Sequence, residues 1–263
     1  RFLSACYTPG SVFKLVTAAT AIDEISNIEE KDFHCDGHLN IDGVRVTCPS
    51  AHGDITFEQA LAVSCNTAFA QITELIGAQT LQRYADNMGL NSALSVDGIS
   101  TAAGSVDVLG AEGADLAWAG IGQYTNSVNP LNFMLYIGAV ANGGVRVKPR
   151  LIAEQGLISR LTKKEDIRIM SEGTAEKLGA MMRNNVLSRY SESNFDGLEL
   201  CAKSGTGEVG GDKEPNAWFV GYLDRNDCPL AFVVVIENGG SGIESAAPVA
   251  SQVLQKAVQR VSG

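Results

Sequence analysis

The sequence lacks any cluster of basic residues and any long apolar run. Its 20 Lys and Arg are outnumbered by 30 Asp and Glu, which gives a formal net charge of −10. Nucleic-acid-binding proteins gather lysine and arginine against the phosphates, so this balance argues against a nucleic-acid partner. The longest apolar run, residues 230–236, is far too short to cross a bilayer. What remains is a chain of 263 residues, which is long enough to bury one sizeable core.

Cysteine is also scarce, with six residues in the chain. A disulfide scaffold needs a much denser set of cysteines, so disulfides do not form the framework of this fold. Four of the six lie in apolar or motif surroundings, where a free cysteine behaves as a small core residue. We expect that role for Cys6, Cys65, Cys201 and Cys228.

The other two cysteines, Cys35 and Cys48, flank a segment that is predicted to form a hairpin turning at residues 42–43. The hairpin would bring its ends together, so a disulfide between them is one alternative. A zinc site is another, because Cys35 with His38 and Cys48 with His52 resembles a zinc spacing. The second pair lacks the usual separation, and we therefore predict no metal.

The order of predicted elements indicates an α+β fold. Helical spacing of apolar residues and capping residues predict helices through the first two thirds of the chain, with an irregular stretch over 91–113. Three strand-like segments follow and predict an antiparallel meander. A closing helix over 246–261 should pack on that sheet. The residues expected at its sheet-facing side are Val249, Val253, Ala257 and Val261.

Three short patterns carry the candidate chemistry. They are S-x-x-K at Ser11 and Lys14, S-x-N at Ser64 and Asn66, and K-S-G beginning at Lys203. Each pattern alone is weak, and S-x-N occurs a second time further along the chain. Together and in this order they form the signature set of the serine enzymes that recognise penicillin.

Ser11 is the candidate nucleophile and Lys14 its base. Ser11 is predicted at a helix start, where free N–H groups and the helix dipole favour developing negative charge. Lys14 follows about one turn later on the same face, within reach of the Ser11 hydroxyl. The pKa of an ordinary lysine is about 10.4, so Lys14 must be buried or lie near another cation to act as a base at neutral pH.

The second motif and the first residue of the third are expected to complete this pocket. Ser64 would pass the proton on to a leaving amine, and Asn66 would donate a hydrogen bond to the substrate amide carbonyl or to Lys14. Lys203 would supply the second positive charge beside Lys14.

The third motif belongs to a predicted strand that offers its backbone to an extended peptide. Gly205 lets this backbone approach a ligand closely. Lys203, Ser204 and Thr206 are expected to bind a terminal carboxylate. The backbone N–H groups of Ser11 and Thr206 are the candidate oxyanion hole.

With these motifs the sequence resembles the transpeptidase domain of penicillin-binding proteins over essentially its whole length. Further stretches resemble that family in the same order, at residues 7–11, 120–123, 141–145, 217–222 and 237–240.

The resemblance implies an antiparallel sheet flanked by helices plus a mostly helical subdomain. We expect one transpeptidase domain over 1–263, with its helical part at about 15–190 and its sheet part at about 1–14 and 191–263.

The resemblance also implies a D,D-transpeptidase that cross-links peptidoglycan stem peptides ending in D-Ala-D-Ala. The reaction would pass through a Ser11 acyl-enzyme without cofactor or metal, and β-lactam antibiotics would inhibit it. Its expected place is the extracytoplasmic face of the bacterial cytoplasmic membrane.

The sequence departs from the family pattern at two motif positions. Cys65 stands where some relatives carry Asp, and Ser204 stands where others carry Thr, but neither change removes a group that the mechanism needs. The family also has a helix and two strands before the nucleophile helix, which ten residues cannot supply. We therefore expect a fragment of a longer chain, with those strands and any membrane anchor in a segment outside it.

Two other functions remain open from the sequence. A β-lactam sensor or a non-catalytic wall-binding scaffold would keep the same motifs without turnover. A serine β-lactamase would need a second base for deacylation, and Glu112 is the only glutamate in the region where that base is expected. This makes a β-lactamase the less favoured reading.

Overall fold

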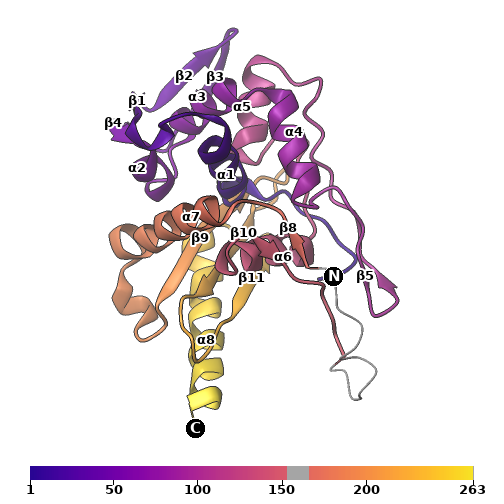
Figure 1. Cartoon of the computed structure of the whole chain (residues 1–263). Helices are drawn as coiled ribbons and strands as arrows, with labels where there is room; N and C mark the ends of the chain where they lie inside the picture. The colour runs from indigo at the N-terminus through magenta and orange to yellow at the C-terminus, as the bar shows by residue number, and fades with distance from the viewer. Residues whose placement is uncertain (153–165, 263) are drawn as a thin grey trace.

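The computed structural model describes residues 1–152 and 166–262 and has an α+β architecture, as predicted. Its helices are α1 (Lys14–Glu24), α2 (Phe57–Ala62), α3 (Asn66–Ile76), α4 (Ala78–Asn87), α5 (Gly113–Ile121), α6 (Pro130–Ala141), α7 (Glu172–Asn185) and α8 (Ala247–Ser262). The long strands are β9 (Leu200–Gly207), β10 (Asn216–Leu223) and β11 (Ala231–Ile236). Figure 1 shows α1–α5 in the upper half and the sheet with α8 in the lower half.

The three long strands form an antiparallel sheet in the order β11-β10-β9, which confirms the predicted meander. Successive side chains of a strand point to opposite faces. Trp218 and Val220 of β10 therefore pack into the core shared with α6 and α7. Phe219, between them, packs into a second core with α8. The sheet is thus buried between two helical layers, and this burial holds β9 in a fixed position.

The closing helix α8 packs on the sheet as predicted, but through a different face. Val249, Val253 and Val261 are exposed, whereas Ala250 and Leu254 are buried against the sheet. Both stripes are apolar, so helical periodicity alone does not decide between them. The buried stripe contains alanine, whose small side chain lets the helix backbone come close to the large ring of Phe219.

Four short strands lie between α1 and α2, and two of them form the predicted hairpin. They are β1 (Asp32–Cys35), β2 (His38–Ile41), β3 (Val44–Thr47) and β4 (Gly53–Thr56). β2 pairs with β3, and β1 pairs with β4. The β2–β3 turn lies at Asp42 and Gly43, both with positive φ, which is the backbone that an Asp-Gly hairpin favours.

Two further short pairs lie outside these regions. β5 (Ser95–Val96) pairs with β6 (Ile99–Ser100), and β7 (Val145–Arg146) pairs with β8 (Ile167–Arg168). The first pair lies within the stretch that was predicted to be irregular. In the part of the chain that the structure describes, no helix has the length and apolar character needed to span a bilayer.

A close contact between Gly10 and Thr206 joins the nucleophile turn to the sheet. Gly10 begins a single 3-10 turn, η1 (Gly10–Phe13), that leads directly into α1. Its φ is +55°, and a Cβ atom there would lie 2.0 Å from the carbonyl oxygen of Thr206 in β9. Only glycine therefore fits where η1 meets β9.

Replacing Gly10 by alanine should destabilise the protein through two separate costs. A left-handed backbone costs a residue with a Cβ about 1–2 kcal/mol, and the overlap with Thr206 adds about 1–3 kcal/mol. Gly43→Ala is the matched control, because Gly43 also has a positive φ but its Cβ would meet nothing within 4 Å. Urea unfolding measures both variants. Equal losses of unfolding free energy would show that the contact with Thr206 has no energetic weight.

Candidate active site

Ser11 and Lys14 lie at the start of the first helical segment, as predicted. Ser11 is in the η1 turn and Lys14 is the first residue of α1. The Lys14 ammonium lies 3.2 Å from the Ser11 hydroxyl oxygen. Phe13 and Leu15, on either side of Lys14, are completely buried. These apolar residues anchor the segment in the core, so the serine and the lysine hold a fixed geometry.

The Ser64 loop is shaped by the end of one helix and the start of the next. The N–H of Ser64 donates to Leu61 O, and the N–H of Cys65 donates to Ala60 O. This pair of bonds is the Schellman arrangement that ends many helices, here α2. It requires a left-handed residue, and Ser64 has φ +54°. The turn directs the Ser64 carbonyl oxygen at Lys14 Nζ, 2.7 Å away.

Lys14 is the central contact of the site. Besides Ser11, its ammonium donates to Ser64 Oγ at 3.1 Å and to Asn66 Oδ1 at 2.7 Å. Lys14 also lies over the ring of Phe69, 5.6 Å from its centroid. The first two motifs, about 50 residues apart in sequence, therefore meet at one nitrogen atom.

Asn66 has the opposite hydrogen-bond direction from the one expected. Its side-chain oxygen accepts from Lys14, and its amide nitrogen donates to the Thr47 carbonyl oxygen at 2.8 Å. Of the two expected roles, donation to Lys14 is wrong, because the side-chain oxygen of Asn66 faces Lys14 Nζ. Donation to the substrate amide carbonyl stays a prediction. Asn66 thus orients Lys14 and ties the site to β3.

Lys203 reaches the same centre from the sheet. Its ammonium donates to Ser64 Oγ at 3.0 Å and to the Ser204 carbonyl oxygen at 2.9 Å. The side chain is completely buried, so it acts on the site from beneath, through Ser64, and does not stand exposed in the cleft. Ser64 is consequently shared by Lys14 and Lys203.

Burial lowers the pKa of both lysines of the site, Lys14 and Lys203. Burial lowers the pKa of Lys14 to about 7, which is the direction that a general base requires. Burial, and then the nearby charge of Lys14, also lower the pKa of Lys203 well below its usual value. The expectation that Lys203 supplies the second positive charge beside Lys14 stays a prediction.

An open cleft of about 700 Å³ leads to these residues. Its walls combine the three motifs, and one side is the exposed part of β9. The predicted residues that line it are Ser11, Ser64, Asn66, Ser204, Gly205 and Thr206. β9 is the edge strand of the sheet, so its outer side faces this cleft and η1.

Gly205 is needed for a reason beyond the predicted approach of a ligand, which stays a prediction. A Cβ at Gly205 would lie 2.8–2.9 Å from Val12 and from the Pro9 carbonyl oxygen. The close approach that the glycine permits is therefore between β9 and the nucleophile turn of the same chain. This contact sets how far Ser11 stands from Thr206.

The sequence motifs do not contain all of the residues that build the cleft. Gln123 donates to the Thr206 carbonyl oxygen at 3.1 Å and accepts from the N–H of Glu208 at 3.3 Å. Tyr190 bonds with Ser204 through both the hydroxyl and the backbone N–H of the serine. The stretch at 120–123 was a signal for Gln123, whereas no local pattern indicates Tyr190.

Comparison with known proteins agrees with this geometry. Residues 1–255 match the family model "Penicillin binding protein transpeptidase domain". The peptidoglycan D,D-transpeptidase PbpA of Mycobacterium tuberculosis is 26% identical, over 98% of this chain and 56% of its own length. The stage V sporulation protein D of Bacillus subtilis is 26% identical, over 94% of this chain and 41% of its own. The chain thus spans about half the length of these curated relatives.

Solved structures show the same fold. The ceftriaxone acyl-enzyme complex of penicillin-binding protein A from M. tuberculosis superposes with a TM-score of 0.86 at 25% identity, covering 97% of this chain and 61% of that one. The D,D-transpeptidase domain of a peptidoglycan glycosyltransferase from Eggerthella lenta gives 0.85 at 23% identity, covering 100% and 67%. The three motifs, the fold and the match over nearly the whole length agree, and the chain belongs to the penicillin-binding protein transpeptidase domain family.

Proposed function

We propose that this chain is a serine D,D-transpeptidase that cross-links peptidoglycan stem peptides ending in D-Ala-D-Ala. One observation carries the proposal. A single buried amine, Lys14 Nζ, bonds the hydroxyls of Ser11 and Ser64 and the amide oxygen of Asn66. Its pKa of about 7 leaves a useful neutral fraction at physiological pH.

Acylation begins when neutral Lys14 takes the proton of the Ser11 hydroxyl. The Ser11 oxygen then attacks the carbonyl carbon of the penultimate D-alanine and forms a C–O bond. Negative charge develops on the carbonyl oxygen, and the backbone N–H groups of Ser11 and Thr206 are proposed to stabilise it. Collapse of this intermediate breaks the peptide C–N bond.

The leaving amine needs a proton, which Lys14 supplies through Ser64. Lys14 Nζ and Ser64 Oγ are 3.1 Å apart, so Ser64 can donate its hydroxyl proton to the amine and take one from Lys14. D-Alanine then leaves and Ser11 remains acylated. An acceptor amine of a second stem peptide then attacks the ester carbonyl carbon and gives up a proton to neutral Lys14 through Ser64. The ester C–O bond breaks as the new peptide C–N bond forms, and Lys14 returns the proton to the Ser11 oxygen.

The substrate is proposed to bind as an added strand along the outer side of β9. Ser204 and Thr206 offer their hydroxyls to the terminal carboxylate, and Lys203 contributes its charge from beneath. The reaction needs no cofactor or metal in this scheme. We also propose the division into a helical part at about 15–190 and a sheet part at about 1–14 and 191–263.

β-Lactam antibiotics are proposed to acylate Ser11 as the substrate does, since they present a strained amide to the same nucleophile. Two curated relatives of the chain are named as peptidoglycan D,D-transpeptidases, and a similar structure is an acyl-enzyme complex with ceftriaxone. Because peptidoglycan lies outside the cytoplasm, the proposed place of action is the extracytoplasmic face of the bacterial cytoplasmic membrane.

Release of D-alanine tests the proposal. We expect the purified protein, given a synthetic stem peptide ending in D-Ala-D-Ala and a D-amino acid acceptor, to release D-alanine and form the exchanged peptide. Mass spectrometry of the products measures both. Absence of D-alanine release together with stoichiometric labelling by penicillin would instead support a sensor or scaffold. Continuous hydrolysis of a chromogenic cephalosporin would support a β-lactamase.

A further inference from the structure

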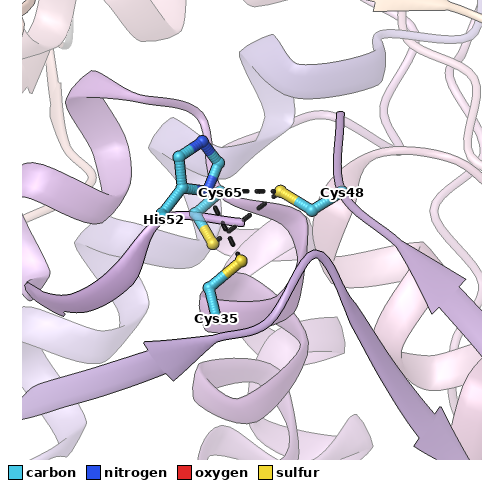
Figure 2. Close-up of side chains that lie close together, drawn as sticks. All are labelled: Cys35, Cys48, His52 and Cys65. Carbon is cyan, nitrogen blue, oxygen red and sulfur yellow. Dashed lines mark hydrogen bonds between the residues drawn. The ribbon is translucent and has the colours of Figure 1, made fainter. Parts of the chain in front are cut away.

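A second cluster of reactive side chains lies beside the proposed active site and takes no part in its chemistry. Three cysteines and one histidine direct their ligand atoms at one another, with all four atoms within 4.8 Å. They are Cys35 at the end of β1, Cys48 just after β3, His52 just before β4, and Cys65 between α2 and α3. Figure 2 shows the three sulfur atoms and the imidazole converging on one point.

The cluster differs from both sequence-based alternatives. Cys35 and Cys48 are free thiols, so the structure contains no disulfide between them. His38 does not belong to the cluster, and Cys65 takes the fourth place. Cys65, which was expected to be a plain core residue, lies 17 residues beyond Cys48 in a different element, so spacing within the hairpin could not indicate it.

Three of the six distances between the ligand atoms match a tetrahedral metal site, and all six are within 4.8 Å. At the usual bond lengths of about 2.3 Å for Zn–S and about 2.0 Å for Zn–N, tetrahedral angles place two sulfurs about 3.8 Å apart and a sulfur and a nitrogen about 3.5 Å apart. In the structure, Cys48 Sγ and Cys65 Sγ are 3.9 Å apart. His52 Nδ1 is 3.4 Å from Cys35 Sγ and 3.5 Å from Cys48 Sγ. A disulfide needs an S–S distance of about 2.05 Å.

The surroundings of the cluster suit a bound cation with thiolate ligands. The backbone N–H of Asn66 donates to Cys48 Sγ at 3.3 Å, and the N–H of Ala68 donates to Cys65 Sγ at 3.4 Å. Both N–H groups belong to the first turn of α3, whose dipole favours negative charge on these sulfurs. Such outer contacts orient the ligands of metal sites.

A contact outside the cluster also orients the histidine. His52 Nε2 lies 3.2 Å from Ser50 Oγ, so the other ring nitrogen, Nδ1, is the one that points at the sulfurs. A hydrogen bond at one ring nitrogen leaves the other free to coordinate a metal.

We propose that Cys35, Cys48, His52 and Cys65 bind one Zn²⁺ as a structural site. Three thiolates and one neutral imidazole form a closed four-ligand set of the Cys₃His type that zinc prefers. Binding releases the three thiol protons, and two metal charges with three thiolates give the site a net charge of −1. Four protein ligands fill a tetrahedral zinc site and leave no open position for catalysis, and Cys35 and Cys65 are buried, with 1% and 0% exposure.

The zinc would hold the second catalytic motif in place. It would join β1, the ends of the β2–β3 hairpin and the junction of α2 with α3. The N–H of Asn66 bonds Cys48 Sγ, and the Asn66 side chain bonds Lys14. The metal would thereby fix the Ser64–Asn66 loop against the hairpin without contacting the substrate.

Elemental analysis and zinc titration of the purified protein test this site. We expect one Zn²⁺ per chain, and after removal by a chelator we expect zinc to bind again with 1:1 stoichiometry. Loss of an outer contact alone typically weakens a metal site by about 10–100-fold, so Cys48→Ser or Cys65→Ser should weaken binding by more than about 100-fold. Cys6→Ser and His38→Ala are the matched controls and should bind zinc like the wild type. Equal zinc affinity in all four variants would overturn the proposal.

A measurement on the wild type avoids any dependence on how the variants fold. X-ray absorption at the zinc edge should show a shell of three sulfurs and one nitrogen. A shell of oxygen and nitrogen only would overturn the proposal. So would an unreduced protein that takes up no zinc and contains a Cys48–Cys65 disulfide. None of these outcomes depends on Ser11 acylation, so the zinc site and the proposed activity can fail separately.

Discussion

Ser11→Ala is expected to abolish covalent labelling by a fluorescent penicillin. The Ser11 oxygen is the only atom that the proposed mechanism joins to the substrate, so its loss removes the acyl-enzyme itself. Removal of a serine nucleophile lowers turnover by about 10⁴-fold or more. The thermal unfolding midpoint should change little, because the hydroxyl is bonded to Lys14 at a long 3.2 Å.

Ser204→Ala is the matched control for this experiment, because Ser204 lines the same cleft. It should still be labelled, although more slowly. Tryptic mapping of the labelled wild type should place the label on Ser11. Labelling of Ser11→Ala at the wild-type rate would refute the nucleophile assignment.

Lys14→Met is expected to reduce the acylation rate by about 10²–10⁴-fold, the usual contribution of a general base. Methionine keeps the length and the apolar part of the side chain, so the buried position stays filled. Lys14→Arg should be equally inactive, because an arginine stays protonated. Lys177→Met is the surface control, since Lys177 lies 2.5 Å from Glu29 on the exterior of the molecule.

The pH dependence of acylation follows from the same residue. Burial disfavours the ammonium form and lowers the pKa of Lys14 to about 7. Below this pH the amine is protonated and cannot accept the Ser11 proton, whereas above it the amine is neutral. The acylation rate should therefore rise through about pH 7 and level off. Because Lys203 shares Ser64 with Lys14, the measured value belongs to the pair. A rate that stays flat from pH 5.5 to about 8.5, or a fully active Lys14→Arg variant, would exclude Lys14 as the base.

The sequence indicated which residues meet at the candidate site better than it predicted the packing. Short motifs indicated four residues, Ser11, Lys14, Ser64 and Asn66. Within each motif the two residues are only two or three positions apart, so the local backbone is enough to bring them together. The contact of Lys203 with Ser64 spans 139 residues, and only the order of the motifs indicated it. Local sequence patterns thus predicted which residues are involved, whereas their hydrogen-bond partners depend on the tertiary structure.

The local turn chemistry of the first half was also readable. Thr56 and Gln59 form a capping box at the start of α2, with both of its hydrogen bonds present. By contrast, α5 was not predicted. Its sequence is rich in alanine and glycine, so it carries no polar face from which a helical period could be recognised. The position of such a buried helix depends on the elements that pack around it, here mainly α3.

Two errors have a common physical cause. The exposed stripe of α8 and its buried stripe are both apolar, and Cys65 lies in apolar surroundings that suit a core residue equally well. In each case the local sequence fits two environments, and contacts with distant segments decide between them. For α8 the deciding contact is with Phe219, and for Cys65 it is with Cys48.

Ser64 receives a hydrogen bond from each of two amines. A hydroxyl oxygen has two lone pairs and one hydrogen. When both lone pairs of Ser64 accept hydrogen bonds, its hydrogen points away from Lys14 and Lys203, toward the open cleft that Ser64 lines. The Ser64 hydroxyl is therefore placed to donate a hydrogen bond to a ligand in the cleft. An inhibitor that offers no acceptor in that direction would leave this hydrogen without a partner, and one that does offer an acceptor would gain a bond already aimed at it.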